Sequence, residues 1–197
     1  MRAYHILASL LFLIFTLPAL GQADSPTVQY QSGKDLAKAG KLTEAITAFD
    51  SAIKLDPTFG EAYVDRGNTY GELKKIREAF ADYIQSIVIE EKKPQTTDRD
   101  RVLWRAYTNR GTILLRTQAY DKAFADYNTA IKLEPKNASE VYNRSILYYI
   151  MGDYDMAVAE LKRARELNPK VLDRNFSRPE AETNKKAWDL RKHPVIE

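Results

Sequence analysis

Apolar and small residues in the middle of the chain recur three and four positions apart, which is the spacing of one face of an α-helix. Four clear runs of this kind are Tyr63, Gly67, Tyr70; Ala79, Tyr83, Ser86; Tyr107, Gly111, Leu114; and Ala123, Tyr127, Ala130. Three prolines, Pro57, Pro135 and Pro169, stand where the second helix of a pair is expected to end. Proline ends a helix because it lacks an amide hydrogen and clashes with the preceding turn. The pattern therefore predicts pairs of helices, each pair forming a hairpin.

The same pattern repeats along the chain. Small residues stand at Gly33, Gly67, Gly111 and Ser145, with steps of 34, 44 and 34. Four other columns keep these steps: Ala45, Ala79, Ala123, Ala157; Phe49, Tyr83, Tyr127, Leu161; Ala52, Ser86, Ala130, Ala164; and Pro57, Glu91, Pro135, Pro169. Five columns with one period and one shared ten-residue insertion indicate a repeat array.

These columns resemble the tetratricopeptide repeat, a 34-residue helical hairpin. Four copies fit residues 26–59, 60–93, 104–137 and 138–171, with the insertion at 94–103. The resemblance implies an all-α solenoid of four antiparallel helix hairpins. Ser145, Leu161, Ser86 and Glu91 depart from the family pattern, each in a different column.

A charged column supports this register. Arginine precedes the small residue in three units, and an acidic residue follows each arginine after 16 positions. The expected pairs are Arg66 with Asp82, Arg110 with Asp126, and Arg144 with Glu160. We interpret them as structural ion pairs between the two helices of one hairpin.

The ends of the array and the insertion carry helix signals of their own. Asp24 or Ser25 caps a first helix that begins at Pro26. In the insertion, we expect Thr97 to cap a backward extension of the next helix and Leu103 and Trp104 to face the preceding hairpin. The insertion is either an added ridge for a partner or a tolerated surface lengthening.

The region after the array, residues 172–197, predicts a helix over about 178–191 and a tail. Arg165 stands where earlier units carry isoleucine, so we expect no fifth unit. The helix is a possible lid over the array.

The first residues are typical of a secretory signal. Arg2 is followed by an apolar run over 6–20, which is shorter than the roughly 20 residues that span a bilayer as a helix. Residues 1–21 are interpreted as a signal peptide, cleaved after Gly21 or alternatively after Ala23. We therefore expect an exported protein, periplasmic or secreted, of bacterial origin in preference, without a stable membrane span after cleavage.

Composition limits the chemistry. The chain has no cysteine, two histidines and a formal charge of +3. This argues against a metal site, a cofactor, a nucleophile–base pair or a nucleic-acid partner. A carboxylate-based hydrolase is a remaining, weaker alternative.

Tetratricopeptide proteins typically hold a peptide or protein on the concave surface formed by their first helices. By that resemblance, the lining residues here are Lys34, Asn68, Glu72, Arg105, Thr108, Thr112, Arg116, Tyr142, Ile146 and Tyr149. Some relatives clamp a peptide carboxylate; Asn68 and Arg105 match that clamp, whereas Tyr30 and Lys34 depart from it.

The resemblance therefore favours a non-enzymatic, exported adaptor that binds a protein or peptide. A structural or self-associating envelope protein is the alternative, and the oligomeric state stays open. Residues after the array could also bury Tyr142, Ile146, Tyr149 and Ile150.

Overall fold

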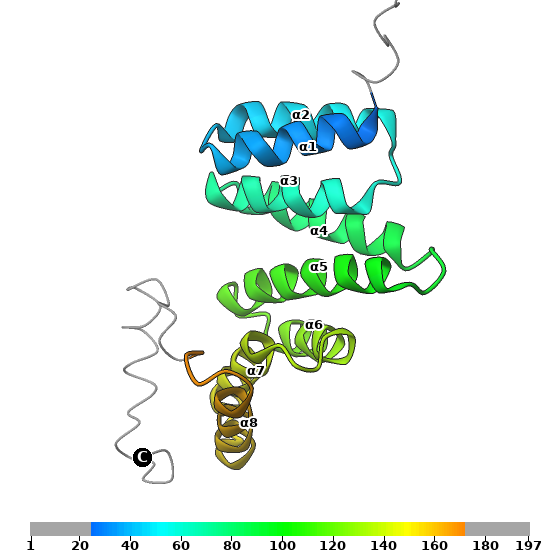
Figure 1. Ribbon diagram of the computed structural model, residues 1–197. Coiled ribbons are helices and arrows are strands. Elements are labelled where there is room, and N and C mark those ends of the chain that lie inside the picture. The colour runs from blue at the N-terminus through cyan, green and yellow to red at the C-terminus, as the bar shows by residue number, and fades with distance from the viewer. Residues whose placement is uncertain (1–24, 172–197) are drawn as a thin grey trace, which may run out of the picture.

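The computed structural model describes residues 25–171, which form eight α-helices and no strand within that range. The helices are α1 (Pro26–Lys38), α2 (Leu42–Leu55), α3 (Gly60–Glu72), α4 (Ile76–Glu90), α5 (Thr97–Arg116), α6 (Tyr120–Leu133), α7 (Ala138–Ile150) and α8 (Tyr154–Leu167). They follow one another as four antiparallel hairpins that stack along the chain (Figure 1). The predicted all-α solenoid is confirmed.

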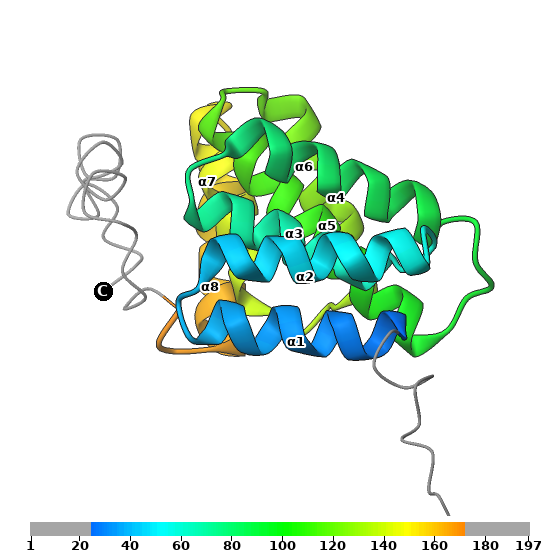
Figure 2. The ribbon, with the colours of Figure 1, turned by 90° about the horizontal axis from the view of Figure 1, so that it is seen from above.

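The stack has an inner row of helices. Each hairpin packs on the next through its second helix, as α2 does on α3 and α4 on α5. The first helices also contact one another, α1 with α3, α3 with α5 and α5 with α7. Second helices of successive hairpins show no comparable contact within residues 25–171, so the first helices form the closer and therefore concave side (Figures 1 and 2).

The small-residue column lets the two helices of a hairpin approach closely. A Cβ atom at Gly33 would lie 2.6 Å from ring carbons of Phe49, and one at Gly67 would lie 2.7 Å from Cε1 of Tyr83. The fourth hairpin has Ser145 and Leu161 at the equivalent positions, both buried. Serine is larger than glycine, and leucine is smaller than the phenylalanine or tyrosine of the other hairpins. The two departures from the repeat pattern thus fall on the same pair of columns and offset each other in size.

The turns inside the hairpins share one backbone conformation. Gly40, Lys74, Gln118 and Gly152 all have positive φ angles, between 61° and 84°, and they follow the steps of the repeat. Glycine adopts this conformation without the steric cost that other residues incur. The repeat therefore extends to backbone geometry that the sequence columns did not reveal.

Helix starts agree in part with the sequence predictions. Ser25 caps α1 by accepting a hydrogen bond from the Val28 amide, and Pro26 is the first helical residue. The cap of α5 is Thr96, which accepts from the Arg99 amide, and not Thr97. Thr97 is already helical, because Thr96 is the residue with the extended backbone that a cap requires.

The insertion extends the third hairpin as part of its core. Val102 and Leu103 are buried against Val64 and Ile87 of the preceding hairpin. Trp104 instead reaches toward Glu140 in α7 of the following hairpin, so its predicted direction was wrong. The helical rotation of about 100° per residue separates it from Leu103. The end of the insertion is thus packed on the preceding hairpin and is more than a surface loop.

No helix within residues 25–171 combines the length and apolarity needed to cross a bilayer. The signal-peptide prediction for 1–21 and the helix prediction for 178–191 lie outside the described residues.

Candidate functional site

The three predicted arginine–acid pairs are brought together between the helices of their hairpins. Arg66 donates from Nε and Nη2 to the Asp82 carboxylate at 2.8 and 2.6 Å, and Arg110 donates to Asp126 at 2.8 and 2.7 Å. Arg144 donates to Oε2 of Glu160 at 3.2 and 2.7 Å. The carboxylates are nearly inaccessible, so these pairs are better shielded from solvent than surface ion pairs.

Two of these arginines also contact the preceding hairpin. Arg66 Nη1 lies 2.5 Å from Oδ1 of Asp50 in α2, and Arg144 Nη1 donates to Oδ1 of Asn128 in α6 at 2.7 Å. Burial alone would lower the pKa of Arg66, but Asp82 and Asp50 raise it above its ordinary value. The sequence analysis missed Asp50 and Asn128, although each stands 16 residues before its arginine. These arginines join hairpins as well as helices.

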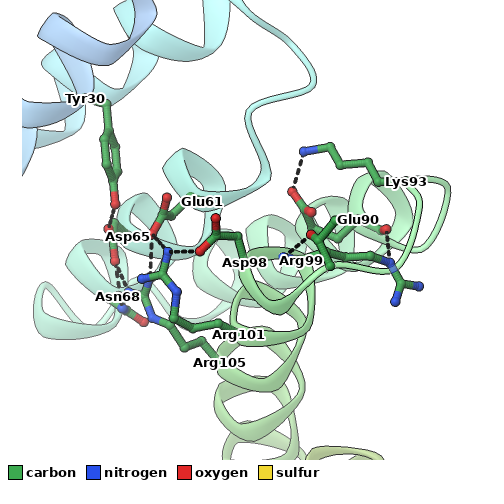
Figure 3. Close-up of polar contacts among 11 residues, drawn as sticks. Tyr30, Glu61, Asp65, Asn68, Glu90, Lys93, Asp98, Arg99, Arg101 and Arg105 are labelled. Carbon is green, nitrogen blue, oxygen red and sulfur yellow. Dashed lines mark hydrogen bonds and ion pairs between the residues drawn. The ribbon is translucent and has the colours of Figure 1, made fainter. Parts of the chain in front are cut away.

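A single carboxylate connects the first three inner helices. Asp65 in α3 accepts a hydrogen bond from the Tyr30 hydroxyl of α1 at 2.6 Å and forms an ion pair with Arg105 of α5 (Figure 3). Burial and Asp65 together raise the pKa of the Tyr30 hydroxyl, which therefore stays protonated as the donor. Asp65 is thus a structural acceptor on the concave side.

Asp65 belongs to a polar column that the sequence analysis did not single out. Asn109 and Asn143 stand at the equivalent positions of the next hairpins. Asn109 Nδ2 donates to Oδ1 of Asn68 in α3 at 2.7 Å, while Asn143 interacts with the Tyr127 hydroxyl of the third hairpin. Each residue of the column thus reaches one hairpin back. The signal was present as the Asp-Arg or Asn-Arg pair before each small residue.

The two residues that match the family's carboxylate clamp have partners inside the molecule. Arg105 pairs with Asp65 and lies 3.8 Å from Glu61. The Asn68 carbonyl oxygen accepts from the Tyr83 hydroxyl at 2.9 Å and from Asn109. A ligand carboxylate at this position would have to displace the contacts that join α1, α3 and α5.

A buried carboxylate lies between the third and fourth hairpins. Glu140 of α7 is 1% exposed, and its Oε1 accepts from the Thr108 hydroxyl at 3.0 Å. Burial raises the pKa of Glu140, an effect that Thr108 and the Trp104 indole only partly offset. Oε2 and the indole nitrogen are both buried and do not complete a hydrogen bond of standard geometry.

The other predicted lining residues occupy several environments. Lys34 lies over the Tyr30 ring at 5.1 Å, and the Thr112 hydroxyl lies 3.1 Å from that of Tyr127. Ile146 is 3% exposed and offers no surface to a partner. Glu72 and Arg116 are exposed, whereas Tyr142 and Tyr149 are partly buried. The accessible part of the predicted lining is therefore concentrated at the later ends of α3, α5 and α7.

The insertion borders a cleft of about 400 Å³ next to this network. Phe59, Pro94 and Val102 form its apolar walls. The charged side chains around it are paired within the protein. Lys93 lies 2.6 Å from Glu90 and Arg101 lies 3.3 Å from Glu61 (Figure 3). Arg99 pairs with Asp100 at 2.9 Å. Because these charges balance one another, the cleft has no distinct preference for an anion or a cation.

Within residues 25–171 there is no group of three or more His, Cys, Asp or Glu side chains placed to hold a metal ion. Several tyrosine hydroxyls have raised pKa values through burial, Tyr107 to about 12 with a further contribution from Glu91. A hydroxyl with a raised pKa remains protonated and is a poor nucleophile at neutral pH.

Family comparisons agree with this arrangement. A family model described as TPR repeat matches residues 33–74. One model described as Tetratricopeptide repeat matches residues 104–137, and a second model with the same description matches residues 60–93 and 141–171. The matches together cover more than half of the chain. The chain belongs to the tetratricopeptide-repeat family. No curated protein matches the chain significantly.

Solved tetratricopeptide structures have the same fold. MamA is 22% identical, with a TM-score of 0.63 over 77% of this chain and 83% of that one. A tetratricopeptide repeat protein from Parabacteroides merdae is 20% identical, with a TM-score of 0.61 over 74% of this chain and 54% of that one. The first TPR of Spaghetti (RPAP3), solved with an HSP90 peptide, is 24% identical, with a TM-score of 0.56 over 64% of this chain and 95% of that one. At these identities the likeness establishes the fold.

Proposed function

We propose that this protein is an exported, non-enzymatic adaptor that binds a peptide or protein on the concave surface of its four hairpins. The observation that carries the proposal is the row of first helices, α1, α3, α5 and α7, which contact one another and form one continuous inner side. A related fold, the first TPR of Spaghetti (RPAP3), was solved with a bound HSP90 peptide. Export rests on the sequence of residues 1–21 alone.

We assign partner binding to a smaller surface than the sequence analysis did. Arg105 and Asn68 have internal partners, so the proposal assigns binding to the accessible later part of the inner helices. Arg116 is exposed at the end of α5, and the Tyr149 ring is partly buried near the end of α7. Arginine and tyrosine commonly contribute much of the energy of protein interfaces.

The test is retention of proteins from the compartment in which the chain resides. Immobilised wild type should retain a specific partner that the double variant Arg116→Glu with Tyr149→Ala loses by tenfold or more, the scale of a hot-spot loss of about 1.4 kcal/mol. Arg77→Glu, an exposed change in the second helix α4, is the matched control and should leave retention unchanged. Equal retention by all three proteins would remove the concave surface as the binding site.

A further inference from the structure

Helix α4, the second helix of the second hairpin, carries exposed aliphatic side chains. Ile84 and Val88 are 37% and 41% exposed, and they share one face of the helix because they stand four positions apart. Ala81 is also exposed and continues this face by about one turn toward the start of the helix. We refer to Ala81, Ile84 and Val88 as the α4 stripe.

The other second helices, α2, α6 and α8, provide an internal comparison. Their residues at the two main positions of the stripe are all polar or charged: Asp50, Asn128 and Lys162 for Ile84, and Lys54, Lys132 and Glu166 for Val88. The same two surface positions are therefore polar in three hairpins and aliphatic in the second alone. Exposed apolar side chains that gather on one face in this way indicate a contact with another molecule.

Ile84 also replaces a contact that the other junctions between hairpins have. Asp50, its equivalent in α2, accepts a hydrogen bond from Nη1 of Arg66 in the next hairpin, and the third hairpin makes the same kind of contact with the fourth. Arg110 is the equivalent arginine after α4, and its hydrogen bonds in the described chain all go to Asp126. This junction thus gives up a hydrogen bond and exposes aliphatic surface to water, and both changes disfavour the isolated chain.

The charges around the α4 stripe fit a second copy of the same helix. Arg77 stands seven residues before Ile84 and Glu91 seven residues after it, which is about two helical turns in each direction. Glu78 and Lys92 stand beside them with the opposite order of signs, and all four side chains are exposed. Two α4 helices that pack antiparallel about Ile84 therefore bring Arg77 level with Glu91 of the other copy and Glu78 level with Lys92. A parallel arrangement would oppose like charges.

We propose that two copies of this chain associate through the α4 stripe, with the helices antiparallel, Ile84 next to the two-fold axis and Ala81 beside Val88 of the other copy. Such a contact is closed, because both copies use the same surface. The stripe lies on a second helix, whereas the first helices form the concave side, so the proposal does not depend on the concave surface binding a partner. The dimer would present two concave surfaces, which strengthens binding to a partner that has two matching segments.

Sedimentation equilibrium over a dilution series tests the association. Wild type should form a dimer that dissociates on dilution, and Ile84→Asp with Val88→Lys should weaken the dimer at least about tenfold. These are the residues that α2 carries at the two positions, and the aspartate can accept from Arg110, so thermal melts should show a folded variant. Asn128→Asp, the same position in α6, is the control and should leave association unchanged. A wild type that is monomeric throughout, or equal association of all three proteins, would overturn the proposal.

Charge reversal tests the antiparallel arrangement. Glu78→Lys should weaken the dimer, because it places two lysines opposite each other, and the added change Lys92→Glu should restore it. The two residues stand 14 positions apart, about 21 Å along one helix, so they do not pair within one copy. A double variant that associates no better than Glu78→Lys alone would contradict the arrangement.

A single cysteine identifies the occupant of the stripe in the native compartment, because the chain has no cysteine of its own. Ile84→Cys should form a disulfide between two copies at least about tenfold faster than Lys162→Cys, an exposed control at the same position in α8, since only residue 84 meets its own copy across the axis. The product has twice the mass of the chain and is thereby distinct from an adduct with a partner of the concave surface. Equal rates, or a link from residue 84 to a different protein, would overturn the proposal.

Discussion

At the scale of residues, the stability of the stack depends on charges removed from water and then paired. Asp126 is almost fully buried and receives two hydrogen bonds from Arg110, itself mostly covered. Breaking such a pair from one side leaves the other charge without its partner, which costs more than the pair itself contributes.

We therefore expect Asp126→Asn to lower the free energy of unfolding by roughly 2 kcal/mol, between the values for exposed and fully buried pairs. Asp121→Asn, an exposed change in the first turn of the same helix, should cost no more than about 1 kcal/mol. Urea denaturation of the two variants measures the difference. Similar losses for both would mean that the Arg110 contact contributes nothing beyond a surface charge.

For Glu140, in contrast to Asp126, we expect that removing the charge does not destabilise the protein at neutral pH. Because burial raises its pKa in the folded protein, its contribution to stability is greatest below the unfolded-state pKa and is lost as pH rises through the folded-state pKa. Glu140→Gln removes the buried charge and keeps the shape, with an amide that can face the Thr108 hydroxyl and a carbonyl that can face the Trp104 indole.

Glu140→Gln should therefore be at least as stable as wild type at pH 7, by up to about 1 kcal/mol, and lose this advantage below about pH 4. Denaturation midpoints of wild type and variant at pH 7 and below about pH 4 show which of the two is more stable at each pH. Thr108→Val probes the same contact. A variant that is less stable than wild type at pH 7 would contradict the role assigned to burial.

At the scale of helices, the repeat columns predict most of what the structure contains. Helical period, proline positions and the small–aromatic columns identify all eight helices because these features act within one hairpin. The sequence did not reveal how one hairpin contacts the next. Asn68 and Arg105 were predicted as lining residues, yet Arg105 pairs with Asp65 and Asn68 accepts a hydrogen bond from Asn109, because stacking brings α3 and α5 together.

The exact helix starts are a second feature that the sequence could not predict. Thr96 and Thr97 are both suitable caps by composition, and only the backbone angles decide between them. Trp104 was assigned to the wrong neighbour for a similar reason, since a one-residue rotation about α5 turns a side chain from one hairpin toward the next.

The close approach of helices within a hairpin predicts the effect of a single methyl group. Gly67→Ala places a Cβ atom 2.7 Å from Tyr83 and 3.3 Å from the Ala79 carbonyl oxygen, so it should destabilise the protein by roughly 1–3 kcal/mol. Adding Tyr83→Leu, the pairing that Ser145 and Leu161 use, should recover part of that loss.

Gly71→Ala in the same helix is the control, because nothing lies within 4 Å of the added Cβ atom. It should be neutral or slightly stabilising, since alanine favours the helix. Thermal melts of the three variants provide the comparison. Equal destabilisation at positions 67 and 71 would show that helix propensity, and not the small–aromatic contact, governs the column.

At the scale of the molecule, the contacts between hairpins convert four similar units into one stack with a defined inner side. Arg66, Asp65 and Arg144 each connect successive units, so these contacts restrain how neighbouring hairpins can move relative to each other. Such a preorganised surface reduces the entropic cost of binding an extended partner.

Photocrosslinking in the native compartment tests this account most directly. A photoreactive residue placed at Glu72 or Arg116, exposed on the inner helices, should yield adducts with one partner, while the same residue at Gln85 or Ala125, exposed on second helices, should not. Adducts of equal yield from both sets, or from the second helices alone, would contradict the concave surface as the binding site.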